Sequence, residues 1–290
     1  MSAVISDAKL AASSAAKSTV EALAPGRLVN TRHGPMLANQ NDVYMGQALL
    51  RYGEYGELES QLLMQLVNRP GLVIEAGANI GTHTIPLARR AGGFGSELIA
   101  FEPQPVIFQN LCANVALNGL LNVRAWPWAC GAEVGKLFFP PPDYLNTGNF
   151  GAVSLQASFA EGLIEVPCVR LDDVIAERPV SLIKIDIEGF ELQALQGAVR
   201  TLEKSRPTLY VENDRVAQSP ALIDWLWSQG YRLWWHIPRL YNPANHFGNE
   251  ENIYGNVASF NMLALPKESK VGVQGLNEIT DQYYHPLGGA

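Results

Sequence analysis

The feature that most constrains the fold is an alternation of short apolar runs with longer amphipathic segments, which begins at residue 72 and continues to residue 229. Short apolar runs bounded by Gly and Pro predict buried strands, and the segments between them predict helices. Strands are expected at 72–76, 97–101, 123–129, 182–187, 208–212, 231–237 and 258–265. Helices are expected at 83–91, 106–118, 172–177, 191–204 and 220–229. Strands that alternate with helices form a mostly parallel sheet covered on both faces.

The end of this pattern differs from its beginning. The runs 231–237 and 258–265 have no helix between them, only a long Asn-rich connection. Two such strands predict a hairpin in which the final strand runs antiparallel. We therefore predict an α/β fold with a mostly parallel seven-stranded sheet, an antiparallel final strand and helices on both faces. The segment 135–165 is expected to add loops and edge strands.

Composition divides the chain into four segments. Residues 1–24 are rich in Ala, Ser and Lys, which predicts a flexible tail. Residues 25–71 predict a helical cap, with an amphipathic helix over 55–69 that ends at Pro70. Residues 72–266 hold the α/β pattern, and residues 267–290 predict a C-terminal tail.

Charge and cysteine content limit the partners and the compartment. The net charge is −7 and no stripe of Lys and Arg is present, so a nucleic-acid partner is not expected. No apolar run reaches about 18 residues, and the N-terminus lacks an apolar signal region, so no membrane span or secretory signal is expected. The scattered cysteines Cys112, Cys130 and Cys168 predict reduced thiols. Together these features predict a soluble cytoplasmic protein, and they are compatible with a homo-oligomer.

A glycine-containing turn follows the first predicted strand, in the sequence VIEAGANIGT at residues 73–82. Gly77 permits a tight turn against a ligand, and Gly81 permits close approach of a helix. Glu75, at the tip of the strand, would repel a pyrophosphate but suits the amino end of S-adenosylmethionine (SAM). Glu102 ends the second strand, where an acidic side chain can accept hydrogen bonds from both ribose hydroxyls. The GxGxxG fingerprint of dinucleotide-binding proteins is not present in this turn.

These residues resemble the FkbM family of methyltransferases, over about residues 31–265. The resemblance is carried by RHGPMLANQNDVYMGQALLRYGEYGELE, VIEAGANIGTHTIPLA, AFEPQP, LIKIDIEGFELQALQGA, YVEND and WWHIPRLYNPANHFGNEENIYGN. It implies the Rossmann-like fold of class I methyltransferases and SAM as the cofactor. Members of the family mostly methylate hydroxyl groups on sugars, glycolipids or polyketides, so the resemblance implies a small-molecule or glycan acceptor without identifying it.

The resemblance also implies a set of cofactor-binding residues. The turn would surround the methionine part of SAM, Glu102 would hold the ribose, and the residues near Cys130 would close over the adenine. The complete predicted set is Glu75, Gly77, Ala78, Asn79, Gly81, Thr82, His83, Glu102, Pro103, Gln104, Cys130 and Asp186.

Transfer of a methyl group to a hydroxyl needs a way to remove the hydroxyl proton. Asp186 and Glu188 follow one buried strand, and Glu212 and Asn213 follow the next. Two interpretations stay open. In the first, Asp186 or Glu188 is the general base and Glu212 orients the acceptor. In the second, Asp186, Glu212 and Asn213 bind one Mg²⁺, whose preferred ligands are oxygen atoms.

Other polar and aromatic residues allow both structural and functional roles. His83, His33 and His236 can contact the cofactor or the acceptor, or can be structural, whereas His246 and His285 are expected at the surface. The asparagines of the late connection can bind sugar hydroxyls or can stabilise turns. They are Asn242, Asn245, Asn249 and Asn252. The paired tryptophans are expected in the core rather than on a sugar ring.

The sequence therefore predicts a SAM-dependent O-methyltransferase. Three alternatives are N-methylation of an amine or peptide, a non-catalytic binding module with the same fold, and a nicotinamide oxidoreductase. The chemistry of the turn disfavours the last of these, and the intact acidic residues disfavour the non-catalytic module.

Overall fold

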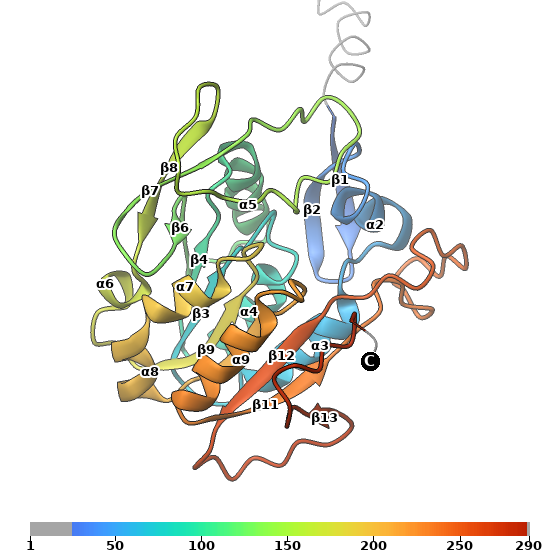
Figure 1. The fold of residues 1–290 in the computed structure, drawn as a ribbon. Helices are drawn as coiled ribbons and strands as arrows, with labels where there is room; N and C mark the ends of the chain where they lie inside the picture. The colour runs from blue at the N-terminus through green and yellow to red at the C-terminus, as the bar shows by residue number, and fades with distance from the viewer. Residues whose placement is uncertain (1–24, 289–290) are drawn as a thin grey trace, which may run out of the picture.

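A large sheet of eight strands forms the centre of the structure, a computed structural model that describes residues 25–288 (Figure 1). Its strands are β3 (Leu72–Ala76), β4 (Leu98–Phe101), β5 (Val123–Trp126), β9 (Val180–Ile185), β10 (Thr208–Glu212), β11 (Tyr231–His236), β12 (Asn261–Pro266) and β13 (Asn277–Glu278). They lie in the order β13-β11-β12-β10-β9-β3-β4-β5. The predicted flexible tail, residues 1–24, lies outside the described residues.

The directions of the strands confirm the predicted sheet. β3, β4, β5, β9 and β10 are parallel to their neighbours within that group. β12 is antiparallel to both β10 and β11, as the missing helix between the last two predicted strands indicated. β13 is an additional strand of two residues at the edge of the sheet. The sheet therefore has eight strands rather than the predicted seven, while its mostly parallel arrangement and the antiparallel β12 are as predicted.

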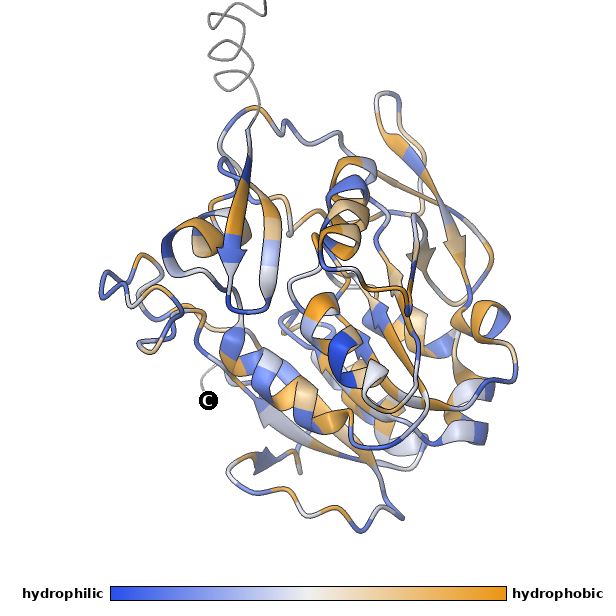
Figure 2. Cartoon of the chain, turned by 180° about the vertical axis from the view of Figure 1, so that it is seen from behind, coloured by the Kyte–Doolittle hydropathy of each residue, from blue (hydrophilic) through white to orange (hydrophobic). Residues whose placement is uncertain are grey.

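Two hydrophobic clusters cover the two faces of this sheet. All six residues of β9 are buried, because Ile183 and Ile185 face one cluster while Leu182 faces the other. The first cluster lies under α7 (Glu191–Gln196), α8 (Val199–Ser205) and α9 (Ser219–Ser228). The second lies under α3 (Glu57–Leu66), α4 (Thr84–Gly92) and α5 (Pro105–Leu117). Figure 2 shows that the surrounding helices carry hydrophilic residues beside their hydrophobic ones.

The predicted helix over 191–204 is wrong in one respect, since the structure contains two short helices, α7 and α8, in its place. The break falls at Gly197, where an added Cβ atom would lie 2.1 Å from the carbonyl oxygen of Gly131. The two backbones therefore meet at a distance that no larger residue permits. A separate short helix, α6 (Leu171–Ile175), precedes β9.

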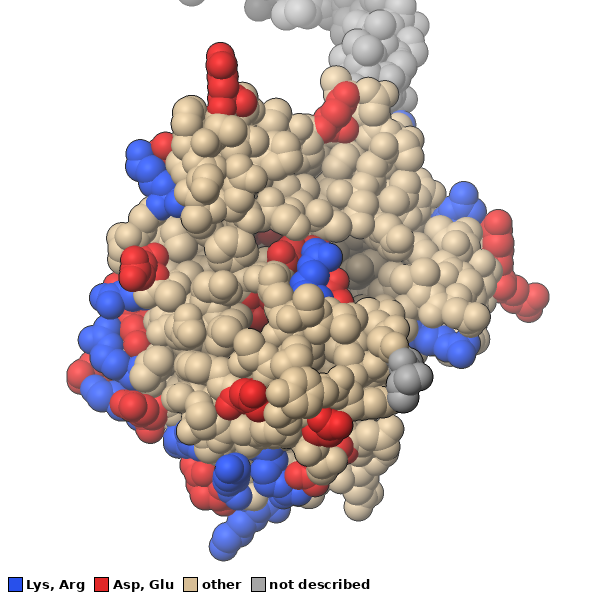
Figure 3. All heavy atoms as spheres, viewed as in Figure 1, with Lys and Arg blue, Asp and Glu red and all other residues tan. Residues whose placement is uncertain are grey.

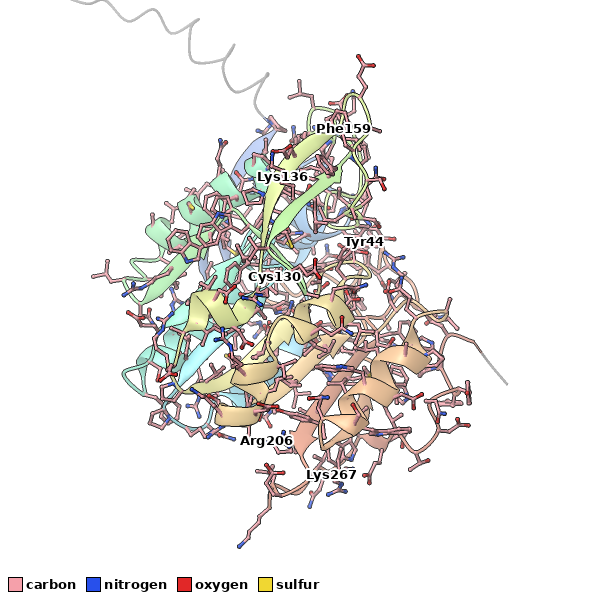
Figure 4. All side chains as sticks on the ribbon, turned by 60° about the vertical axis from the view of Figure 1, so that its left-hand side comes forward. Tyr44, Cys130, Lys136, Phe159, Arg206 and Lys267 are labelled. Atoms are coloured by element: carbon pink, nitrogen blue, oxygen red, sulfur yellow. The ribbon has the colours of Figure 1, made fainter. Side chains whose placement is uncertain are left out.

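The predicted strand over 123–129 is also divided. Pro127, which has no N–H for a sheet ladder, separates β5 from β6 (Ala129–Cys130). β6 belongs to a second sheet of three strands with β7 (Gly135–Phe139) and β8 (Ile164–Val169), in the order β6-β8-β7. This small sheet comes mainly from the segment predicted as loops and edge strands, and Phe159 marks its outer end in Figure 4.

The N-terminal segment is not wholly helical, which corrects the prediction for residues 25–71. β1 (Gly26–Thr31) and β2 (Gly34–Asn39) form an antiparallel hairpin, followed by α2 (Met45–Tyr52) and by α3. Gly34 has φ +120°, a value that favours glycine at the turn. Val29, Met36 and Ala38 point into a small core, an alternation too short to recognise in the sequence. This hairpin lies beside α5 in Figures 1 and 2.

The C-terminal segment, predicted as a tail over 267–290, contains further structure over residues 267–288, because β13 pairs with β11 and Ile279 is buried. His285, predicted at the surface, is buried and bonds through Nε2 to the carbonyl oxygen of Asn213 at 2.7 Å. Over residues 25–288, no helix is both long enough and apolar enough to cross a bilayer.

Candidate functional site

A cavity of about 400 Å³ lies at the carboxyl ends of β3, β4, β9 and β10, where ligands bind in open α/β sheets. Its other walls come from the N-terminal segment, from residues 149–155 and from residues 257–260. Figure 3 shows a hollow near the centre of this face, with acidic and basic side chains inside it. Figure 4 labels two of the lining residues, Tyr44 from the N-terminal segment and Cys130 from β6.

The turn after β3 has the tight geometry that its glycines predicted. Gly77 has φ +82°, and an added Cβ atom would lie 1.8 Å from the carbonyl oxygen of Asp186. The turn therefore packs against the end of β9 in a way that only glycine allows. Gly81 has φ +93°, and an added Cβ atom would lie 2.9 Å from Leu111 on α5. Gly81 thus allows the close approach of α5, and it does not line the cavity, although it was predicted to bind the cofactor.

Glu102 is held firmly at the tip of β4. Its Oε2 accepts a hydrogen bond from the backbone N–H of Asn79 at 3.0 Å, and its Oε1 accepts one from that of Gln104 at 2.9 Å. Burial raises the pKa of Glu102 to about 7, against the effect of these two hydrogen bonds. Each carboxylate oxygen keeps a further lone pair for a ligand hydroxyl.

The wall beside Glu102 is apolar and partly aromatic. Pro103, Gln104 and Cys130 line it as predicted, together with Trp128, which the sequence analysis placed in the core. Trp126 stacks on Trp128 with the ring centroids 4.4 Å apart. The segment 149–155 also lines this wall and was missed, because its Asn, Gly and Ser content indicated only a loop. An apolar wall that contains an indole ring suits a purine base.

Carboxylates gather on the opposite side of the turn, at the ends of β9 and β10. Asp186, Glu188 and Glu212 all line the cavity, and Asp214 joins them. Oxygen atoms of Glu188, Glu212 and Asp214 lie within 4.8 Å of one another. Arg215, which the sequence analysis missed, forms an ion pair with Glu188 and lies 3.4 Å from Asp214.

Burial gives these carboxyl groups unusual proton affinities. The pKa of Glu188 is raised to about 7, first by burial and then by the charge of Asp186, although Arg215 opposes the shift. Burial, and then the same charge, raises the pKa of Glu212 well above its ordinary value. The Oε2 atom of Glu212 is buried and has no hydrogen-bond partner within the described chain. Glu188 also has φ +58°, a conformation that costs energy in a non-glycine residue and is found at functional sites.

The structure does not bring together the predicted Mg²⁺ ligands. Asn213 is buried outside the cavity, where its Nδ2 donates a hydrogen bond to Ser219 Oγ at 2.8 Å. Asp186 instead accepts a hydrogen bond from the Nζ of Lys184 at 3.1 Å. The side chain of Asn213 follows the alternation of the strand and points away from that of Glu212, since consecutive residues face opposite ways.

Glu75 does not line the cavity, although the sequence placed it at the methionine end of the cofactor. It is buried, and its Oε2 accepts a hydrogen bond from the Oγ1 of Thr84 at 2.6 Å. Two charged residues outside the predicted cofactor-binding set line the cavity, Glu59 from α3 and Lys184 from β9. Lys184 lies two residues before Asp186, and residues two apart in a strand point to the same face of the sheet. The KIDIE motif therefore already indicated the direction of the Lys184 side chain.

Of the histidines, only His83 lines the cavity within the described residues. It is buried, its Nδ1 bonds to Ser60 Oγ at 2.9 Å, and burial lowers its pKa well below the ordinary value. His33 instead bonds to Glu57 at 2.7 Å, and His236 bonds to the hydroxyl of Tyr210 at 2.7 Å. Both therefore have structural partners. His246 is exposed, as predicted.

The asparagines of the late connection stabilise its turns and do not line the cavity. Asn245 Oδ1 accepts a hydrogen bond from the N–H of Asn249, and Asn252 Oδ1 accepts one from that of Tyr254. Asn242 donates to Glu54 Oε1 at 2.8 Å, which ties this connection to the N-terminal segment. Of the two roles left open by the sequence, turn formation is the one these contacts display.

The topology and the site together define a class of protein. Seven strands of the large sheet lie in the order β11-β12-β10-β9-β3-β4-β5, and only β12 among them is antiparallel. A glycine turn follows β3, and an acidic residue follows β4. This is the arrangement of class I, SAM-dependent methyltransferases. Residues 75–233 match the methyltransferase FkbM domain family. Because this match covers more than half of the chain, the chain belongs to the FkbM family of methyltransferases.

Curated relatives agree with this assignment. The 31-O-demethyl-FK506 methyltransferase FkbM of Streptomyces tacrolimicus is 31% identical, over 59% of this chain and 76% of its own length. Methyltransferase sdnD of Sordaria araneosa is 28% identical, over 49% of this chain and 67% of its own. Hexuronic acid methyltransferase AglP of Haloferax volcanii is 25% identical, over 49% of this chain and 56% of its own. The chain thus spans between 56 and 76% of these relatives.

Proposed function

We propose that this chain transfers the methyl group of SAM to a hydroxyl oxygen on a sugar, glycolipid or secondary metabolite. The observation that carries the proposal is Glu188, a carboxyl group of pKa about 7 that lines the cavity beside the cofactor turn. A base with this pKa is half ionised at neutral pH, so a large fraction can accept a proton, and it holds the proton more tightly than an ordinary carboxylate does. Two of the relatives are named for 31-O-demethyl-FK506 and for hexuronic acid.

The cavity has the parts that SAM requires. Glu102 would hold the ribose, the wall at Trp128 and Cys130 would cover the adenine, and the turn at Gly77 would lie against the methionine part. When bound, SAM supplies an electrophilic methyl group on a positively charged sulfur. The carboxylates of Asp186 and Glu188 provide the negative environment that favours such a cation.

The residues of the chain then serve the acceptor. Glu188 takes the hydroxyl proton as the acceptor oxygen bonds to the methyl carbon and the bond from that carbon to sulfur breaks. Arg215 keeps Glu188 in place and favours its ionised form. Burial raises the pKa of Glu212 well above its ordinary value, which favours the protonated form, and in that form its buried carboxyl group donates a hydrogen bond that orients the acceptor. Asp186, paired with Lys184, stays beside the cofactor turn rather than reaching for the proton.

N-methylation is a second candidate that one observation favours. The carboxyl groups of Glu188, Glu212 and Asp214 lie close together, and those that are ionised would attract a cationic amine. An amine loses its proton more easily than a hydroxyl, so the loss of Glu188 would then be less severe.

The test combines cofactor binding with a survey of acceptors. Calorimetry with SAM, S-adenosylhomocysteine (SAH) and NAD shows which cofactor binds, and a labelled-methyl assay against hydroxylated sugars, glycolipids, macrolides and primary amines shows the acceptor. We expect SAM and SAH to bind and a hydroxylated acceptor to gain the label. Glu188→Gln should lower turnover by about 10²–10⁴-fold, the usual contribution of a general base. The exposed Glu203→Gln is the matched control.

Other outcomes would overturn the proposal. Labelling of amines alone, with Glu188→Gln nearly as active as the original chain, would favour N-methylation. Cofactor binding without turnover on any acceptor would favour a binding module, and binding of NAD alone would reject the site as described.

A further inference from the structure

The cavity contains a buried carboxylate that comes from outside the family-matched residues 75–233. Glu59 lies on α3, and only 6% of its side chain is exposed. It lines the cavity beside Thr82, His83 and Lys184. This places an acidic group at the end of the cavity that lies across the glycine turn from Glu102.

The carboxylate of Glu59 has room for a further donor. Its Oε2 accepts a hydrogen bond from Asn261 Nδ2 at 3.4 Å, and its Oε1 lies 3.5 Å from the Nε2 of His83. Both distances are longer than the usual 2.9–3.0 Å of a protein hydrogen bond. A carboxylate accepts up to about four hydrogen bonds, so these contacts leave most of its capacity unused.

Glu75, the acidic residue that the cofactor motif would select for the same task, is placed differently. It is buried below the turn and does not line the cavity. Its Oε2 is engaged at 2.6 Å by the hydroxyl of Thr84 in the first turn of α4, while its Oε1 has no partner among residues 25–288. Glu75 therefore supports α4 from below, whereas Glu59 faces the space that a ligand would occupy.

The local charge also favours an additional cation. Lys184 is the one ammonium near Glu59, Glu75 and Asp186 within the described structure, and it is paired with Asp186 at 3.1 Å. Three carboxyl groups thus share one positive charge in a buried region. Burial raises the pKa of Glu59 to about 7. An ammonium group beside Glu59 would lower this pKa again, because it favours the ionised carboxylate. Such a site stabilises a ligand that brings its own positive charge.

We propose that Glu59, rather than Glu75, binds the α-ammonium group of the methionine part of SAM. The inference rests on the proposed function, because it takes the cavity to be the SAM site. A ligand with its ribose at Glu102 and its sulfur beside the glycine turn directs its amino-acid end toward Thr82, His83 and Glu59. The N-terminal segment then supplies a side chain that binds the cofactor, in addition to covering the site.

The test measures binding rather than turnover, with two ligands that differ only at this end. SAH carries the amino-acid group, whereas 5′-methylthioadenosine has the same adenosine and a thioether but no amino-acid group. For the full chain, calorimetry should show that Glu59→Gln weakens SAH binding at least tenfold, or about 1.4 kcal/mol. Binding of 5′-methylthioadenosine should change less than twofold. Glu102→Gln should weaken both ligands alike, and Glu75→Gln should leave the ratio of their affinities unchanged.

A third ligand makes the test independent of any general damage that the substitution does to the protein. The SAH analogue that lacks the α-amino group should bind the original chain at least tenfold more weakly than SAH does, and Glu59→Gln should bind the two equally. If Glu59→Gln proves unstable, Glu59→Asp withdraws the carboxylate by one methylene and should give a smaller loss confined to SAH.

Three results would overturn the inference. They are equal weakening of SAH and 5′-methylthioadenosine by Glu59→Gln, no weakening of either, and a loss specific to SAH in Glu75→Gln. Failure of the original chain to bind either adenosine ligand would instead reject the proposed function, so the two failures are distinguishable.

Discussion

Replacement of Arg215 by Gln should move the pH dependence of methyl transfer toward alkaline pH. Glu188, with a pKa of about 7, must be ionised to accept a proton. About one-eleventh of the enzyme is then competent at pH 6 and ten-elevenths at pH 8, so kcat/KM should rise about tenfold between them. Arg215 lowers the pKa of Glu188 through its charge, and its loss therefore raises that pKa.

The size of the shift follows from the exposure of the ion pair. Two charges about 4 Å apart interact by about 4 kcal/mol at an effective dielectric constant of about 20, which would shift the pKa by about three units. The side chain of Arg215 is 41% exposed, so solvent screens most of this energy. We expect a shift of about one unit, which lowers kcat/KM at pH 7 about fivefold while the plateau at high pH is kept.

The assay is kcat/KM for the labelled methyl group between pH 5.5 and 9, with the original chain, Arg215→Gln and the control Arg200→Gln. Arg200 is 64% exposed and pairs with Asp172 and Asp173, away from the cavity. Because Glu188 and Glu212 interact, the measured midpoint belongs to the pair. An unchanged midpoint, or one that moves toward acid pH in Arg215→Gln, would refute the role of Glu188 as the base.

Four further outcomes are expected. Glu102→Ala should weaken SAM binding at least tenfold by calorimetry with an unchanged circular dichroism spectrum, and an unaltered Kd would remove its role at the ribose. Asp186→Ala should lower turnover, because it removes a carboxylate that favours the positively charged sulfur of SAM and leaves Lys184 without its partner; unchanged turnover would remove this role of Asp186. Burial raises the pKa of Glu59, Glu75 and Glu102 in the folded state to about 7, so the contribution of these three groups to the stability of the ligand-free protein is fully present below about pH 4 and is lost as the pH rises through 7. Thermal unfolding from pH 4.5 to 8, compared with Glu59→Gln, in which one of the three groups cannot ionise, measures this contribution, and a difference in Tm that does not change with pH would contradict it. Methyl transfer should persist in EDTA, because the predicted ligand Asn213 lies outside the cavity and Arg215 pairs with Glu188 and Asp214; inactivation that Mg²⁺ reverses would restore the metal hypothesis.

The sheet was predictable because its information is local. Each strand is a short run of apolar residues, and each glycine turn or proline marks an end, so the alternation of elements appears directly in the sequence. The direction of β12 followed from the missing helix between it and β11. The residues that line the cavity from the ends of β3, β4, β9 and β10 were predicted for the same reason, since carboxyl ends of parallel strands meet at one edge.

The N-terminal segment and the fine placement of side chains were not predictable. The hairpin of β1 and β2 is stabilised by packing against distant residues, such as the contact of Asn114 with the backbone of Leu37 at 2.6 Å. Asn213 looked like a metal ligand because it follows Glu212, yet the alternation of a strand turns it to the other face. The division of the predicted helix at Gly197 depends on its contact with Gly131, 66 residues earlier in the numbering (197 − 131).

By itself, the sequence determined the order of strands and helices, the family and the ring of residues at the strand tips, because each depends on patterns within a few neighbouring residues. Only the tertiary structure decided which acidic group faces the cavity. Glu59 and Glu75 lie 16 positions apart (75 − 59) and have the same chemistry, but α3 turns one toward the ligand space and Thr84 holds the other beneath the turn. That choice results from packing between elements distant in sequence, and so does the burial that sets their pKa values.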